Sequence, residues 1–100
     1  MKKIEGMSIL ITGGGSGIGA GAARYFSELG AKVTICGRRE ENLMKVSKEI
    51  GPNCFGIRGD VSIAKQRAKV VDSAVRHGNG LDALCLLPYF SLFKPKKVKD

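Results

Sequence analysis

The sequence predicts an α/β domain built on a parallel sheet. Apolar runs of strand length alternate with amphipathic stretches of helix length along most of the 100 residues. A glycine cluster, Thr-Gly-Gly-Gly-Ser-Gly-Ile-Gly at 12–19, directly follows the first apolar run. The composition is 43% hydrophobic and 26% charged, which is typical of a globular chain and sufficient for one domain. The alternation therefore indicates strands joined by crossover helices.

The first strand and the first helix lie on either side of the glycine cluster. The run Met-Ser-Ile-Leu-Ile at 7–11 has the length and branching of a buried strand, which we place at about 7–12. A helix is predicted over about 17–29, and Gly30 follows it as a C-cap. The apolar residues at helical spacing, which we expect to face the core, are Ile18, Ala22, Phe26 and Leu29.

Two further strand and helix pairs follow, and a fourth strand begins near Leu81. The second strand is predicted at about 32–36 and its helix at 39–50. The third strand is predicted at about 53–58 and its helix at 63–77. The residues expected to face inward are Leu43, Val46 and Ile50 in the second helix, and Ala64, Ala68, Val71 and Val75 in the third.

The glycine cluster is typical of a turn that cradles phosphate. Gly13 and Gly17 can take positive φ in a tight turn, and without Cβ atoms they let a ligand approach the backbone. A helix that begins at such a turn directs unpaired N–H groups and the positive end of its dipole at the ligand. Gly19 would let the helix pack closely on the strand. The alternative is a loop that collects glycine for steric reasons alone.

The spacing of Gly13, Gly17 and Gly19, with Thr12 before it and Ile18 inside it, resembles the T-G-x-x-x-G-I-G signature of the short-chain dehydrogenase/reductase family. The resemblance continues through 29–33, 59–62 and 80–84, and covers about 5–85. It implies a Rossmann-type doubly wound parallel sheet, incomplete, with about four strands in the order 3-2-1-4 and three helices.

The resemblance also implies that the turn binds a dinucleotide. The residues of the turn that would hold it are Gly13, Gly15, Ser16, Gly17, Ile18 and Gly19. At the end of the second strand, NAD-binding members usually have an acidic residue, whereas this chain has Gly37 followed by Arg38. Planar guanidinium groups suit a 2′-phosphate, so the resemblance favours NADP(H) over NAD(H). The alternative for the Arg38-Arg39 pair is a solvated helix start.

The last two residues expected at the cofactor site are Asp60 and Val61, because their positions in the sequence match those of family residues that contact the adenine. In the family, the matching aspartate hydrogen-bonds the adenine amino group, and the backbone of the next residue contacts the ring. The resemblance therefore places Asp60 and Val61 at the far wall of an adenine pocket. The alternative is that Asp60 is only a turn residue next to Ser62.

The resemblance ends after about residue 84. The family continues with Asn-Asn-Ala-Gly or a close variant, whereas residues 85–89 are Cys-Leu-Leu-Pro-Tyr, and Pro88 would interrupt a sheet ladder. The family's serine and Tyr-x-x-x-Lys set has no match, because Leu29 and Phe93 stand four residues after Tyr25 and Tyr89. No catalytic residue can be named.

We therefore expect the N-terminal nucleotide-binding half only, truncated or frameshifted after about residue 84. It would consist of a partial Rossmann domain over 1–87 and a divergent tail, apolar and then basic, over 88–100. The predicted function is that of an NADP-dependent short-chain oxidoreductase, which transfers hydride between NADP(H) and a carbonyl or alcohol. This chain would keep the cofactor-binding half and be inactive alone.

The alternative is a non-catalytic interaction or regulatory fragment that pairs with a full-length relative. We expect the edge of the fourth strand to be exposed and to allow self-association. A P-loop nucleotide hydrolase is disfavoured, because the turn lacks the Gly-Lys-Ser/Thr ending that holds phosphate and Mg²⁺.

The charge and the cysteine content lead to further expectations about the partners and the location of the chain. The formal net charge is +8, of which 94–100 supply +3 through four lysines and one aspartate. We expect these lysines to be solvated and expect no nucleic-acid partner. No apolar stretch has membrane-spanning length and no cleavable leader follows Met1, so we expect a cytoplasmic location without membrane contact. The three cysteines, Cys36, Cys54 and Cys85, are expected to be buried thiols without a metal.

Overall fold

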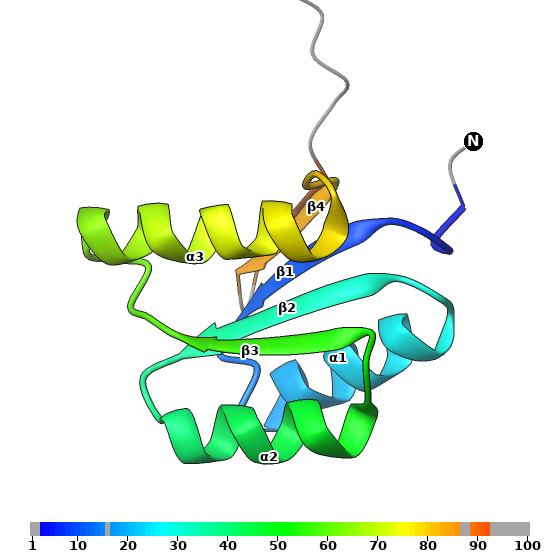
Figure 1. The fold of residues 1–100 in the computed structure, drawn as a ribbon, viewed down its shortest axis with the longest axis horizontal. Coiled ribbons are helices and arrows are strands. Elements are labelled where there is room, and N and C mark those ends of the chain that lie inside the picture. The colour runs from blue at the N-terminus through cyan, green and yellow to red at the C-terminus, as the bar shows by residue number, and fades with distance from the viewer. Residues whose placement is uncertain (1–2, 16, 87–88, 93–100) are drawn as a thin grey trace, which may run out of the picture.

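The fold is described by a computed structural model, which covers residues 3–15, 17–86 and, for the backbone only, 89–92. The strands are β1 (Ser8–Thr12), β2 (Lys32–Gly37), β3 (Cys54–Arg58), β4 (Ala83–Leu86) and β5 (Tyr89–Leu92), and the helices are α1 (Gly17–Glu28), α2 (Glu40–Ile50) and α3 (Ala64–Gly78) (Figure 1). The first four strands and the three helices lie within two residues of their predicted bounds.

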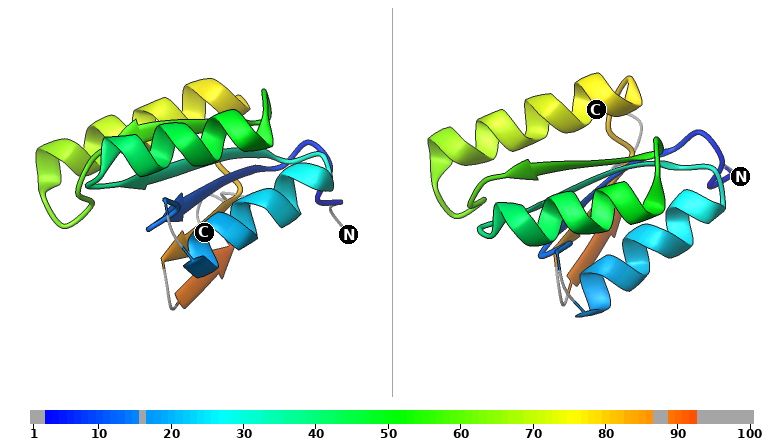
Figure 2. Two further views of the ribbon diagram at one scale, coloured as in Figure 1. Left: turned by 90° about the horizontal axis from the view of Figure 1, so that it is seen from below. Right: turned by 60° about the horizontal axis from the view of Figure 1, so that its bottom comes forward.

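The five strands form one sheet in the order β3-β2-β1-β4-β5. The first four are parallel, with β1 between β2 and β4, which confirms the predicted order 3-2-1-4. Figures 1 and 2 show α1 and α2 on one face of the sheet and α3 on the other. Because the strands are parallel, their carboxyl ends meet at one edge of the sheet, where ligands of such folds bind.

The fifth strand was not predicted. It pairs antiparallel with β4, with Leu86 opposite Tyr89 and Ala83 opposite Leu92. Figure 2 shows β5 beside β4, at the end of the sheet remote from β3. The edge of β4 is therefore not open as expected, because β5 hydrogen-bonds to it. The predicted disruption of the ladder by Pro88 lies outside the described residues, as do the side chains of 89–92.

Each face of the sheet has its own apolar core. The larger core lies between the sheet and α1 and α2 and contains Ile9, Ile11, Ile35 and Leu43, all at most 1% exposed. The smaller core lies under α3 and contains Leu10, Cys36, Val70 and Ala74. Alternate residues of β1 thus point to opposite faces, and both faces are buried, as parallel strands require.

The predicted inward face is confirmed for α2, where Leu43 and Val46 are buried and Ile50 packs against the core. In α1 it is wrong in part, since Ile18 is 78% exposed and Leu29 is 42% exposed. The residues of α1 that are buried are small: Gly19, Ala23 and Ser27. Ala22 and Phe26 are partly buried and pack against the larger core, as predicted.

In α3 the predicted inward face is also wrong. The buried residues are Val70 and Ala74, whereas Val71 and Val75 are 36% and 40% exposed. Two glycines explain the orientation. A Cβ on Gly59 would collide with the Val70 side chain, and one on Gly78 would collide with Ser8. These contacts fix the rotation of α3 one residue away from the predicted position.

The three cysteines are free and buried, as predicted. Cys54 and Cys85 belong to the larger core and Cys36 to the smaller one. None of the helices in the described part of the chain has the length and apolar character needed to cross a membrane.

Candidate functional site: a pocket at the carboxyl ends of the strands

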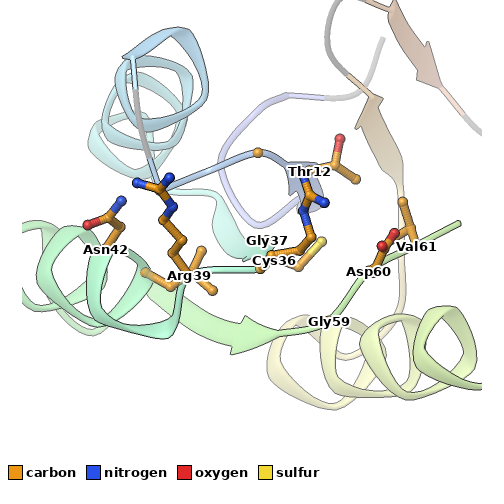
Figure 3. A pocket seen from close by; sticks show the side chains of 12 residues that line it. Thr12, Cys36, Gly37, Arg39, Asn42, Gly59, Asp60 and Val61 are labelled. Atoms are coloured by element: carbon orange, nitrogen blue, oxygen red, sulfur yellow. The ribbon is translucent and has the colours of Figure 1, made fainter. Parts of the chain in front are cut away.

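A pocket of about 630 Å³ opens where β1, β2 and β3 end. This volume is within the usual range for small-molecule and cofactor sites. Figure 3 shows the labelled side chains converging from these three strand ends and from the start of α2. The lining residues are Thr12, Gly13, Gly15, Cys36, Gly37, Arg38, Arg39, Asn42, Leu43, Gly59, Asp60 and Val61.

The glycine turn forms one wall of the pocket. The N–H groups of Gly13 and Gly14 both donate to the carbonyl oxygen of Cys36, at 2.9 and 3.3 Å, and so fix the turn to the end of β2. Gly13 and Gly17 have φ of +69° and +48°, which confirms the predicted need for glycine. The turn therefore presents backbone without Cβ atoms to the cavity, as a bound pyrophosphate requires.

The first turn of α1 supports this wall from behind. A Cβ on Gly19 would collide with the carbonyl oxygen of Gly13, so the helix can begin here only with glycine at that position. Gly17, Ile18 and Gly19 do not line the pocket, although all three were predicted to bind the cofactor. Ser16, predicted with them, lies outside the described residues.

Two cations line the pocket directly after β2, whereas Glu40 and Glu41, which follow them, do not line it. The pocket is lined there by Gly37, Arg38 and Arg39, the last of which precedes the first residue of α2. A Cβ on Gly37 would lie 3.6 Å from Leu43, so the absent side chain leaves space toward α2. The end of β2 therefore offers guanidinium groups to an anion.

Sequence reasoning named Arg39, beside Arg38, as a cation suited to a phosphate, but it did not identify Asn42 as a site residue. Figure 3 shows both side chains on the same side of the pocket. Asn42 lies beside the glycine turn, because a Cβ on Gly15 would lie 3.1 Å from the Cβ of Asn42. The available signal is helical spacing: Asn42 is three positions after Arg39, so both lie on one face at the start of α2. Arg39, Asn42 and Gly15 thus surround one corner of the cavity.

The opposite wall is formed where β3 ends. Asp60 accepts two hydrogen bonds at Oδ1, from the Ser62 backbone N–H at 2.9 Å and from the Ser62 hydroxyl at 2.6 Å. These bonds hold the pKa of the Asp60 carboxyl below its ordinary value of 3.8, and the nearby charge of Arg38 acts in the same direction. Asp60 is therefore both a turn residue, as the alternative proposed, and an ionised group that lines the pocket.

Two neighbours complete that wall. The carbonyl oxygen of Val61 accepts a hydrogen bond from Arg67 Nη1 at 2.8 Å, which ties the turn to α3. Cys36 also lines the cavity, and burial raises the pKa of its thiol to about 11, with the Asp60 charge adding to the rise. The thiol is therefore neutral and acts as a small apolar surface.

Comparisons with known proteins agree with this geometry. The family model described as short chain dehydrogenase matches residues 7–86. The short chain dehydrogenase mdpC of Emericella nidulans is 37% identical over 87 residues, which are 83% of this chain and 33% of that protein. A peroxisomal 2,4-dienoyl-CoA reductase of Arabidopsis thaliana is 36% identical over 84 residues, 81% of this chain and 28% of its own length.

A solved structure shows the same fold. The 3-ketoacyl-(acyl-carrier-protein) reductase from Brucella melitensis, complexed with NADH, has a TM-score of 0.78 and 36% identity over 81% of this chain and 34% of that one. The fold and pocket are those of a dinucleotide-binding α/β domain. The chain belongs to the short-chain dehydrogenase family and spans about a third of the length of the relatives it matches.

Proposed function

We propose that this chain is the cofactor-binding part of a short-chain oxidoreductase and that it binds NADP(H) in preference to NAD(H). The observation that carries the preference is the end of β2, where Gly37, Arg38 and Arg39 all line the pocket and Gly37 stands in place of an acidic residue. A 2′-phosphate there would meet two guanidinium groups, whereas a ribose hydroxyl would find no carboxylate to accept its hydrogen bonds.

Each wall of the pocket has a proposed task. The turn with Gly13, Gly15, Ser16 and Gly17 would hold the pyrophosphate, together with the N–H groups of Ile18 and Gly19 at the start of α1. Asp60 and Val61 would hold the adenine ring at the far wall. Cys36, neutral and buried, would contact the ring without offering a charge. The bound nicotinamide would supply the hydride that a carbonyl substrate accepts.

Arg39 and Asn42 add support to the proposed 2′-phosphate site. Both line the same corner of the cavity, beside Gly15. An amide N–H₂ group can donate to a phosphate oxygen, and two cations nearby compensate its charge. This corner is therefore suited to a dianion at the adenosine ribose.

Titration of the purified chain with NADPH and with NADH tests the proposal. We expect tighter binding of NADPH, and we expect Arg38→Asp to weaken NADPH binding by about tenfold or more, because hydrogen bonds to charged groups contribute about 1.5–3 kcal/mol. NADH binding should stay equal or improve. Tighter binding of NADH by the unaltered chain would refute the preference.

Lys45→Asp is the matched control. It makes the same change of charge on the exposed side of α2, at a residue that does not line the pocket. NADPH affinity should change far less than in Arg38→Asp. Equal losses in the two variants would mean that the overall positive charge, and not the end of β2, attracts the cofactor.

A further inference from the structure

Two side chains in the first turn of α3 reach back to the turn that carries Asp60 and Val61. Gln66 Oε1 accepts a hydrogen bond from the Asp60 backbone N–H at 2.8 Å. Arg67 Nη1 donates to the Val61 carbonyl oxygen, also at 2.8 Å. Both lengths are those of well-formed hydrogen bonds. The start of α3 is therefore bonded to both of the residues that line the pocket at the far wall.

These two side chains hold the turn and do not cap the helix. A glutamine in the first turn of a helix commonly bonds to the backbone N–H of the cap residue. The cap residue here is Ile63, and its N–H already donates to the carbonyl oxygen of Asp60 at 3.0 Å. Gln66 instead extends beyond Ile63 to the N–H of Asp60. The contact thus orders the wall of the pocket.

The bonds from α3 leave a specific pair of groups free on this wall. Three of the four backbone N–H and C=O groups of Asp60 and Val61 are bonded to the start of α3. Within the described part of the chain, the fourth group, the Val61 N–H, has no partner. Asp60 Oδ2 has none either, because both bonds that the carboxylate accepts go to Oδ1. Figure 3 shows both residues on the wall of the pocket.

A free donor beside a free acceptor matches one edge of adenine. That edge carries the N1 acceptor next to the exocyclic N–H₂ donor. The Val61 N–H can donate to N1 while Asp60 Oδ2 accepts from the amino group. Both bonds form together only if the two groups are held in place, since a hydrogen bond weakens steeply as its angle departs from linearity. The position of the turn therefore controls how well this base is distinguished from others.

We propose that Gln66 and Arg67 are positioning residues that hold Asp60 and Val61 in the geometry that selects adenine. The inference rests on the proposed function, because it needs the adenine of the cofactor at this wall. Neither Gln66 nor Arg67 lines the pocket, so each acts through the wall. Their loss should reduce discrimination between bases, because that discrimination depends on buried polar groups that only the correct base can pair.

Titration of the full chain with two matched cofactors tests the inference. One is NADPH, and the other is its analogue with hypoxanthine in place of adenine. Hypoxanthine has a carbonyl oxygen in place of the amino group and an N1–H in place of the N1 acceptor, so it loses both bonds at equal charge. We expect the unaltered chain to bind NADPH about tenfold more tightly or better. A general loss of folding or of positive charge would weaken both cofactors alike and leave the ratio of their Kd values unchanged.

Substitutions in α3 should change this ratio. Arg67→Met and Gln66→Leu should each lower the preference for NADPH about threefold or more, because each removes one hydrogen bond to the wall. Arg67→Lys and Gln66→Glu keep a donor and an acceptor at these positions and should retain most of the preference. Lys69→Met is the control, because it removes a charge from an exposed side chain of α3 that does not line the pocket. An unchanged ratio in Arg67→Met or Gln66→Leu, or an equal fall in Lys69→Met, would overturn the inference.

Hydrogen exchange of the Asp60 amide tests the contact with Gln66 without any cofactor. Gln66→Leu should speed this exchange about threefold or more, because the N–H loses its acceptor, whereas Gln66→Glu should preserve the protection. Equal exchange in the unaltered chain and in Gln66→Leu would show that Gln66 does not hold the turn and would overturn its role.

The titrations separate failure of this inference from failure of the proposed function. If the unaltered chain binds no NADPH, the proposed function fails and the inference fails with it. If it binds NADPH and the hypoxanthine analogue equally well, cofactor binding stands but the wall does not select adenine. If it prefers NADPH and the variants of Gln66 and Arg67 keep that preference, only the inference is overturned.

Discussion

The carbonyl oxygen of Gly13 occupies the space that a Cβ on Gly19 would need. This contact joins the first residue of the glycine turn to the first turn of α1 and fixes the distance between the helix and the sheet. The glycine at 19 is therefore required by packing, and the glycine at 13 by its φ of +69°.

Gly19→Ala should destabilise the chain by about 1–3 kcal/mol, since overpacking of a closely packed contact costs that much. Gly21, in the same helix, has nothing within 4 Å of its potential Cβ. Gly21→Ala should therefore stabilise the chain by about 0.4–1 kcal/mol. Urea unfolding of both variants measures the two effects, and destabilisation by Gly21→Ala, or none by Gly19→Ala, would contradict the packing argument.

Ser62→Ala should raise the pKa of Asp60 toward its ordinary value, because the side-chain hydrogen bond from Ser62 is the largest cause of the depression. A carboxyl with a lowered folded pKa contributes stability above its unfolded pKa and loses it as pH falls through the folded pKa. Ser62→Ala should therefore lower stability near neutral pH and matter less in acid. Carbon-detected NMR titration measures the pKa of Asp60 directly. An unchanged titration midpoint in Ser62→Ala would show that the Ser62 hydroxyl does not lower this pKa.

The buried thiols should resist alkylation. Burial raises the pKa of Cys36 and of Cys54 to about 11, so about one thiol in a thousand is ionised at pH 8. Iodoacetamide should label the native chain far more slowly than the urea-unfolded chain. Because these folded pKa values are raised, the stability they contribute is present below pH 9 and declines as pH rises toward 11. Rapid labelling of native Cys36 would indicate that the smaller core opens readily.

Removal of residues 88–100 should increase self-association, because it deletes β5 and leaves the edge of β4 without a partner. The matched deletion of 93–100 keeps β5 and removes only the basic end, with its +3 charge. Sedimentation velocity measures the self-association of each truncated chain. Equal behaviour of both truncated chains would show that β5 does not protect the sheet.

The chain alone should not turn over carbonyl or alcohol substrates. A placed proton donor contributes about 10²–10⁴-fold, and Tyr25 and Tyr89 have no lysine four residues later. The assay is NADPH oxidation by tag-free protein with Gly17→Trp as the control for the cofactor site. Oxidation that is reproducible and abolished by Gly17→Trp would contradict the expectation.

The strand order and most of the pocket could be predicted from sequence, because glycine spacing and strand alternation are local signals. Gly13, Gly15, Gly37, Arg38, Asp60 and Val61 all line the cavity. The rotation of α1 and α3 could not be predicted. Each helix has two apolar rows, and the choice depends on contacts such as Gly78 with Ser8, which are 70 residues apart.

Asn42 was missed for a related reason. Its place in the pocket depends on how α2 leaves β2, which no short motif encodes. The strand β5 was missed because its residues have no counterpart in the family signature, and pairing with β4 depends on the path of the chain between the two strands.

The antiparallel direction of β5 reverses the path of the polypeptide. After β4, the chain is at the same edge of the sheet as Thr12 and the pocket; after β5, Leu92 lies opposite Ala83, which itself lies beside Ile9 at the start of β1. Any group attached beyond Leu92 therefore starts from the amino-terminal edge of the parallel strands. To reach the nicotinamide end of a bound cofactor it would have to travel the height of the sheet, about 3.3 Å for each residue of strand. An affinity tag or fluorophore attached directly after Leu92 would therefore start at the edge of the sheet opposite the pocket.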